Sequence, residues 1–200
     1  MRVPNFSYNH VIKSYIVSES LLWSGYSLII PIFAIFVVNN IEEGSIEIAA
    51  MGFSTYLITR VIFELLSGQY LGKSSDKKKF LITVTGLICM SLAYIGFAIS
   101  ETVPEIFFFY AIAGLGIGIA SPAKNALFSM HLDKNKESTE WGVTEASVFI
   151  CMAVATTAGG LLAQRYGFDL LFYIAAVINL LAIFPYLKYI KPYFKTTRVQ

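Results

Sequence analysis

Residues 46–71 read IEIAAMGFSTYLITRVIFELLSGQYL, and the basic segment GKSSDKKK follows at 72–79. The first stretch is long and apolar enough to cross a bilayer as one helix, which needs about 20 residues. Because Lys and Arg are retained on the cytoplasmic side of a membrane, the lysines after residue 71 place this end in the cytoplasm. The stretch therefore predicts a membrane span that enters from outside.

Five further apolar runs of similar length complete a chain of 200 residues, of which 56% are hydrophobic and 14% charged. This composition is unlike that of soluble domains. We predict an all-α membrane protein with one domain, residues 1–200, and a basic cytoplasmic tail at 188–200. The six predicted spans cover 14–38, 46–71, 80–100, 104–128, 141–163 and 168–187.

Basic residues are distributed unequally between the two sides of the predicted membrane. Thirteen of the fifteen Lys and Arg residues fall on one side, whereas the opposite loops are acidic and carry Arg165 as their cation. We therefore expect a multi-pass protein of the plasma or inner membrane with both termini in the cytoplasm. The first run has no small-residue cleavage site after it, so we expect a span there rather than a removed signal.

Three charged residues stand out as candidates deep within the predicted spans, where an ionisable side chain is costly. Arg60 lies near the middle of its span, and Glu64 follows four residues later on the same helix face. Glu19 is expected at a depth similar to that of Glu64. Tyr56 precedes Arg60 by one turn, so we take Glu19, Tyr56, Arg60 and Glu64 as candidate site residues.

Two interpretations of these charges remain open. A structural ion pair would hold helices in register, and Arg60 could then lie between Glu19 and Glu64. Alternatively, the charges line a cavity for substrate or protons, because a carboxylate in low-dielectric surroundings binds a proton more readily than in water.

Other polar residues have simpler explanations. Lys124 and Glu145 lie near the cytoplasmic ends of their spans, where long side chains can extend to the interface. Glu145 could instead pair with a loop lysine. Asn179 lies in mid-span, and we expect an interhelical hydrogen bond there. Small residues such as Gly114 and Gly118 indicate close helix packing.

Several classes of function are disfavoured by the residues present. The histidines, His10 and His131, lie outside the predicted spans, so an intramembrane Ser–His or zinc site lacks a histidine. Hydrolase, metalloprotease and phosphate-binding motifs do not occur. We predict no enzymatic activity, no catalytic residues, no metal, no cofactor and no nucleic-acid partner.

The loop between the second and third spans carries a motif, Gly72 with Asp76 and Lys77. In this position it resembles the loop signature of the major facilitator superfamily, Gly-x-x-x-Asp-Arg/Lys followed by Gly and basic residues. The second glycine and the following arginine of that signature are missing here. The stretches SLIIPIFAIFV, GLGIGIASPAKNALFS and AGGLLAQRYGFDLLFYIAAV are similar to other spans of the family. The drug-antiporter motif of the fifth span is half present, as Gly159 and Gly160.

The resemblance implies a secondary transporter of a small solute that works by alternating access. Members normally have two six-span halves related by an axis along the membrane normal, each with nested three-helix repeats. This chain offers six spans, so a parallel homodimer or a second six-span half would complete the plan. The resemblance also implies that Gly72, Asp76 and Lys77 stabilise one conformation, and proton coupling through a buried acid is a further option. The alternative is a non-transporting six-helix subunit or scaffold that pairs with another membrane protein.

Overall fold

The structure is a computed structural model, and it describes residues 10–187. Those residues are helical, apart from short turns and one isolated bridge between Glu42 and Thr102. Six helical segments are long and apolar enough to cross a membrane. The prediction of an all-α membrane protein with six spans is therefore confirmed. The expected tail at 188–200 lies outside the described residues.

The first membrane segment is broken near its outer end. Helix α1 (His10–Ile29) leads through the 3-10 turn η1 (Ile30–Ile32) into α2 (Phe33–Asn40). Pro31 lies at the start of the 3-10 turn. Proline has no N–H and cannot continue the α-helical hydrogen bonds, which explains the break.

Five helices supply the other membrane segments: α3 (Ile46–Leu71), α4 (Asp76–Ala98), α5 (Val103–Met130), α6 (Glu137–Tyr166) and α7 (Phe168–Leu181), the last segment continuing to Leu187. Most of them extend beyond the apolar runs because polar residues cap the added turns. At the start of α5, the Glu105 carboxylate accepts from the Thr102 N–H at 3.0 Å in a capping box. At the start of α6, the Glu140 carboxylate accepts from the Asp133 N–H at 2.9 Å.

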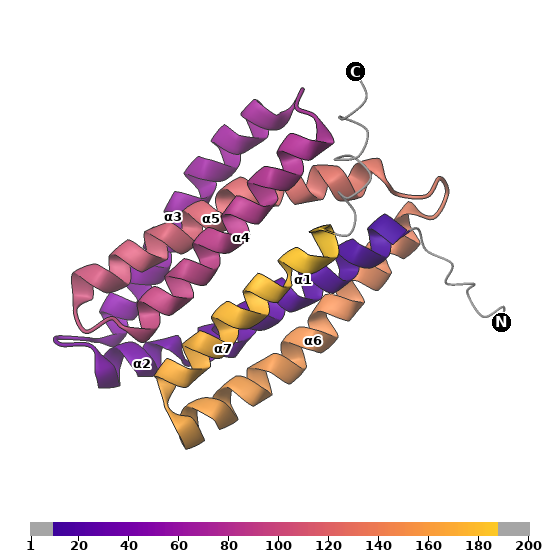
Figure 1. The fold of residues 1–200 in the computed structure, drawn as a ribbon. Coiled ribbons are helices and arrows are strands. Elements are labelled where there is room, and N and C mark those ends of the chain that lie inside the picture. Colours follow the sequence, from indigo (N-terminus) through magenta and orange to yellow (C-terminus); the bar gives the residue numbers. More distant parts are fainter. Residues whose placement is uncertain (1–9, 188–200) are drawn as a thin grey trace.

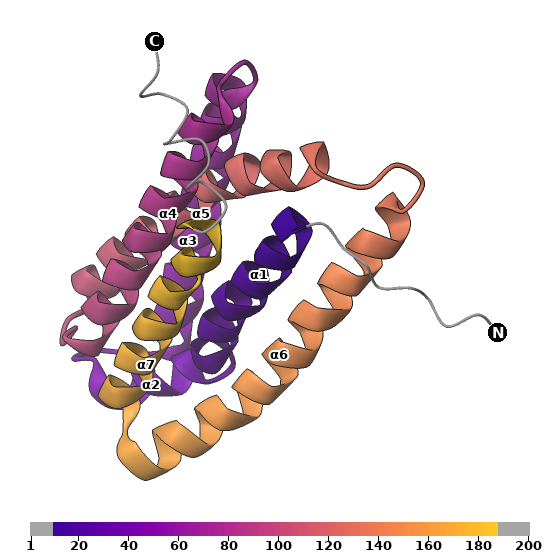
Figure 2. The same cartoon turned by 45° about the vertical axis from the view of Figure 1, so that its right-hand side comes forward.

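The helices form two groups (Figures 1 and 2). In one group α5 packs against both α3 and α4, and in the other α1 packs against both α6 and α7. Contacts between α4 and α7 join the two groups. Asn179 of α7 strengthens this junction, because its Nδ2 donates to the Leu87 carbonyl at 2.8 Å and to the Ser91 hydroxyl at 2.7 Å. The predicted interhelical hydrogen bond of Asn179 is thus confirmed.

Glycines allow α3 and α5 to approach closely. A Cβ atom at Gly114 would overlap the carbonyl oxygen of Tyr56, and one at Gly118 would lie 2.8 Å from the carbonyl oxygen of Arg60. The close-packing role predicted for these glycines is confirmed. Their consequence is positional: α5 holds the stretch of α3 that carries Tyr56, Arg60 and Glu64.

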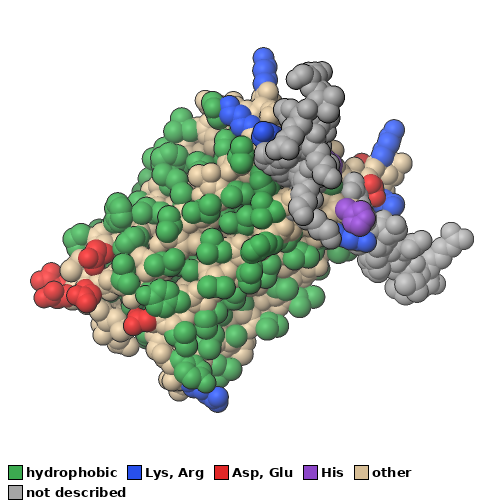
Figure 3. All heavy atoms as spheres, viewed as in Figure 1, with side chains coloured by type: hydrophobic (Ala, Val, Ile, Leu, Met, Phe, Trp, Pro, Cys, Tyr) green, Lys and Arg blue, Asp and Glu red, His purple; other side chains and the backbone are tan. Residues whose placement is uncertain are grey.

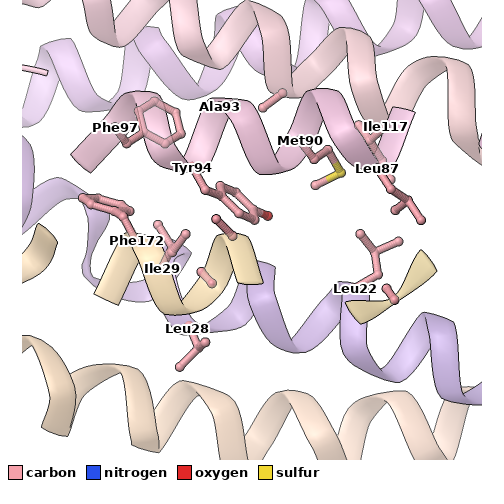
Figure 4. Packing of buried hydrophobic residues seen from close by; sticks show 14 of the residues in the cluster. Leu22, Leu28, Ile29, Leu87, Met90, Ala93, Tyr94, Phe97, Ile117 and Phe172 are labelled. Carbon is pink, nitrogen blue, oxygen red and sulfur yellow. The ribbon is translucent and has the colours of Figure 1, made fainter. Parts of the chain in front are cut away.

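A cluster of aromatic and aliphatic side chains fills the junction between the groups. Figure 4 shows Tyr94 and Met90 of α4 pointing toward α1 and α7, with Phe97 and Phe172 nearby. Phe33 contacts Phe97 with ring centroids 4.8 Å apart. Between α4 and its neighbours the rings of Tyr26, Tyr94 and Phe97 leave a void of only about 10 Å³, whereas a hollow of about 230 Å³ lies between Ile30, Ala49 and Phe53.

Charged side chains gather at opposite ends of the molecule. Figure 3 shows acidic side chains at one end and most basic side chains at the other, with an apolar belt between them. At the acidic end, the Glu42 N–H donates to the Glu101 carbonyl at 2.9 Å and ties two loops together. The separation agrees with a transmembrane orientation, and the assignment of the basic end to the cytoplasm stays a prediction.

Candidate functional site

A cavity of about 360 Å³ lies between α1, α5 and α6, with one contribution from α3. It occupies the half of the bundle that carries the start of α1 and the end of α5, opposite the packed aromatic half. Four elements line it: Tyr15, Glu19 and Trp23 from α1; Arg60 from α3; Ser121, Lys124 and Asn125 from α5; and Trp141, Thr144, Glu145, Val148, Phe149 and Met152 from α6.

A buried ion pair crosses this cavity wall. The Lys124 ammonium donates to Glu19 Oε2, and the two side chains are 4% and 6% exposed. The indole N–H of Trp23 donates to the same oxygen at 3.1 Å. The other carboxylate oxygen, Oε1, is buried and has no hydrogen-bond partner among the described residues. Both contacts of the Glu19 carboxylate thus converge on one of its two oxygens.

The placement of Lys124 corrects the sequence-based expectation. We expected its side chain to extend to the membrane surface, but it turns inward from α5 toward α1. The reason is that the carboxylate of Glu19 compensates its charge, whereas an unpaired ammonium at this depth would be costly. One signal in the sequence was available: an acid and a base lie at matched distances from the ends of the predicted spans 14–38 and 104–128.

Aromatic rings surround the pair. The Lys124 nitrogen lies 6.0 Å from the ring centroid of Tyr15 and 5.9 Å from that of Trp23. The Tyr15 hydroxyl donates to Asn125 Oδ1 at 2.9 Å, and its ring stacks on Phe128 at 4.1 Å. These contacts hold the rings in fixed positions around the ammonium. Sequence reasoning did not identify Tyr15 or Trp23 as site residues.

The second ion pair lies on α3. Arg60 Nε donates to Glu64 Oε2 at 3.2 Å, with the side chains 28% and 39% exposed. Tyr56 is buried, and its hydroxyl interacts with the Arg60 guanidinium. The structure thus brings Tyr56, Arg60 and Glu64 together as one row, but only Arg60 reaches the large cavity. Arg60 does not lie between two acids, because Glu19 forms its ion pair with Lys124.

Glu145 faces the cavity from α6 between two aromatic residues. Trp141, Glu145 and Phe149 follow one another at intervals of four residues, so they share one helix face. No cation within residues 10–187 forms an ion pair with Glu145, so the suggested latch to a loop lysine is absent from that part of the chain.

The loop motif occupies the turn between α3 and α4. Gly72 ends α3, and Asp76 begins α4, where a helix dipole favours negative charge. Lys79, which the motif does not include, is buried; its nitrogen donates to the Ser74 carbonyl at 2.8 Å and lies 3.6 Å from Asp76 Oδ1. The motif is therefore built into a compact turn at the basic end, and none of its three residues lines the cavity.

Comparison with known protein families matches residues 16–199 to the Major Facilitator Superfamily. The chain belongs to that superfamily. Among the curated relatives of this superfamily member, multidrug resistance protein MdtG of Escherichia coli (strain K12 / DH10B) is 23% identical over 165 residues, which are 82% of this chain and 40% of the relative. The Bacillibactin exporter of Bacillus subtilis (strain 168) is 25% identical over 119 residues, 60% of this chain and 29% of the relative.

As a member of the superfamily, the chain spans less than half the length of the relatives that it matches. Its six membrane-length helices agree with one half of the superfamily fold. Helices α3 and α6 both border the cavity. In the apolar stretch of each, only 17% is buried inside the protein, whereas 56% is buried in the corresponding stretches of α4 and α5. In the described chain, α3 and α6 are therefore the helices with the least buried apolar stretches.

Proposed function

We propose that this protein is a secondary transporter of a small solute and that the cavity between α1, α5 and α6 is its solute site. The observation that supports this most directly is a cavity of about 360 Å³ that encloses a buried ion pair within membrane-spanning helices. Ionisable groups at such depth are costly and are usually retained for transport of solutes or protons. Two relatives carry names that describe export and multidrug resistance.

The mechanism that fits is alternating access, in which two six-helix units rock against each other around a central site. In this proposal the second unit is another copy of the same chain in the same orientation. The separation of acidic and basic ends favours a parallel pair, because an antiparallel pair would place basic loops on both sides.

The faces that the second copy would cover are those of α3 and α6. On α3, Ile58 and Val61 are exposed, and on α6, Ile150 and Val154 are exposed. The half-exposed Arg60–Glu64 pair on α3 points to the same conclusion, since a charged pair is stable toward protein or water and costly toward lipid. A partner on this side would close the cavity and shield the pair.

Coupling to protons is part of the proposal. Glu19 is the candidate carrier, because its carboxylate is buried, lines the cavity and has one oxygen without a partner among the described residues. Protonation of Glu19 would release Lys124 from its ion pair and change the charge inside the cavity. The loop residues Gly72, Asp76 and Lys77 would stabilise one of the two conformations from the basic end.

The first experiment is a count of subunits in lipid nanodiscs by native mass spectrometry, followed by cross-linking. In a chain whose native cysteines, Cys89 and Cys151, are replaced by alanine, Ile58→Cys and Val154→Cys lie twelve residues from the acidic ends of α3 and α6. A parallel dimer that joins α3 to α6 should give a disulfide-linked dimer from the double variant and none from either single variant. A monomer in nanodiscs would overturn the homodimer. Stoichiometric co-purification of a different membrane protein would favour a six-helix subunit instead.

Alternating access has its own test. Ser121→Cys in the same background places a thiol on the cavity wall. An impermeant maleimide should label this cysteine from the basic side, and addition of a transported solute should change the rate of labelling. If no solute from a broad screen changes the rate of labelling, the cavity is not the transport site.

A further inference from the structure

We infer that the cavity selects an organic cation, an ammonium or quaternary ammonium group that carries an apolar substituent. The inference rests on the proposed function, since it names the class of solute for the same cavity. Its central feature is the stripe Trp141–Glu145–Phe149 on α6, of which the sequence analysis considered only Glu145, and as a residue of the membrane interface.

The first argument is the charge of the cavity wall. Lys124 is neutralised by Glu19, and Arg60 is neutralised by Glu64. Glu145 also lines the cavity, and no cation within residues 10–187 pairs with it. The two bases are paired with Glu19 and Glu64, so the carboxylate of Glu145 gives the group a net negative charge. Glu145 is exposed toward the cavity, and a cavity wall with an uncompensated carboxylate attracts a cation and repels an anion.

The second argument is the position of the aromatic rings. Trp141 precedes Glu145 by four residues and Phe149 follows it by four, so the carboxylate lies between two rings on one helix face. Both rings are accessible, with 36% of Trp141 and 63% of Phe149 exposed. Aromatic faces attract cations, and rings combined with a carboxylate are the chemistry that recognises quaternary ammonium groups.

The third argument is a cation that the cavity already contains. The ammonium of Lys124 lies about 6 Å from the ring centroids of Tyr15 and Trp23 while it pairs with Glu19. On the α1 and α5 side, the wall therefore already combines a carboxylate, two rings and an ammonium. On the α6 side, the same carboxylate-and-ring combination is present without a cation from residues 10–187. The apolar substituent would lie against Val148 and Met152, which line the cavity beside the stripe.

The chain contains a built-in probe for this site. It has two tryptophans, and both, Trp23 and Trp141, line the cavity. Intrinsic tryptophan fluorescence of the purified protein in nanodiscs therefore reports occupancy without a label. We would titrate phenyltrimethylammonium and, as an anion of similar size, benzenesulfonate. Empty nanodiscs give the correction for partitioning into lipid.

The expected result is a saturable fluorescence change with phenyltrimethylammonium and none with benzenesulfonate over the same concentrations. Glu145→Gln should weaken cation binding about tenfold, because it removes the attraction between the carboxylate and the bound cation and leaves both rings in place. Glu137→Gln is the matched control, because Glu137 lies on the same helix but outside the cavity lining, and its affinity should stay unchanged. Glu145→Lys should reverse the preference toward benzenesulfonate.

Three outcomes would overturn the inference: preferential binding of benzenesulfonate, binding of neither ion, or equal cation affinity in Glu145→Gln and the unsubstituted protein. Should the variants fail to fold, as judged by circular dichroism and gel filtration, the comparison of the two ions on the unsubstituted protein still tests whether the cavity prefers a cation. Binding at equilibrium is independent of transport. A protein that binds the cation but moves no solute would contradict the proposed function alone, and one that transports a solute without preferring the cation would contradict this inference alone.

Discussion

Lys124 of α5 and Glu19 of α1 form an ion pair across the cavity wall although 105 residues separate them in the chain. Few other contacts join α1 directly to α5, since α1 packs mainly on α6 and α7 while α5 packs mainly on α3 and α4. The pair is thus a direct polar link between the two helix groups. Separation of the two groups near the cavity would lengthen or break it.

We expect substitution of one partner of this pair to destabilise the protein strongly. Lys124→Met leaves Glu19 as a buried, uncompensated carboxylate, and breaking a buried pair in this way costs about 3–5 kcal/mol. The melting temperature of the purified protein should fall accordingly. The double variant Glu19→Leu with Lys124→Met removes both charges and should recover much of the loss. Equal melting temperatures for the single variant and the unsubstituted protein would mean that the pair contributes nothing to stability.

Glu19→Gln tests proton coupling separately from stability. Glutamine keeps the size of the side chain but cannot exchange a proton, so the pH dependence of transport should become flat while some transport remains. The measurement is the initial rate of uptake into proteoliposomes at several pH values, with the solute found by screening. An unchanged pH profile would exclude Glu19 as the proton carrier.

Arg60→Ala should abolish transport while leaving folded protein in the membrane. Arg60 lines the cavity, whereas Tyr56 and Glu64 do not. Alanine also leaves Glu64 without its ion-pair partner. Arg165→Ala is the matched control, because Arg165 lies in the last turn of α6 at the acidic end and outside the cavity lining. Transport at the normal rate by Arg60→Ala would remove Arg60 from the site.

Gly114→Ala should separate α3 from α5. The added methyl group would overlap the carbonyl oxygen of Tyr56 and approach Thr59 Cβ at 3.0 Å, and overpacking of this kind costs about 1–3 kcal/mol. Gly160→Ala is the control, because nothing lies within 4 Å of a Cβ added there. Thermal unfolding should be earlier for the first variant and unchanged for the second. If both behaved alike, the close approach of α3 and α5 at Gly114 would not matter for stability.

The sequence by itself determined the class of fold and its element order. Continuous apolar runs of about 20 residues are typical of helices, because a helix satisfies its backbone N–H and C=O groups within the segment, as lipid requires. Local rules also predicted the Arg60–Glu64 pair, since residues four apart on a helix are neighbours, and the hydrogen-bonding role of Asn179. The superfamily was predictable too, because the loop at Gly72–Lys77 and several spans resemble it over nearly the whole chain.

Only the tertiary structure decided which charges meet. Hydropathy locates Glu19, Lys124 and Glu145 along the membrane normal, but it does not say toward which neighbour each side chain points. That depends on the rotation of each helix about its axis, which packing sets through contacts such as those of Gly114 and Gly118 with α3. Lys124 therefore turned out to be buried against α1, and Glu145 turned out to share the cavity with it. The depth of a charge in the membrane follows from the sequence, whereas its partner follows from the packing.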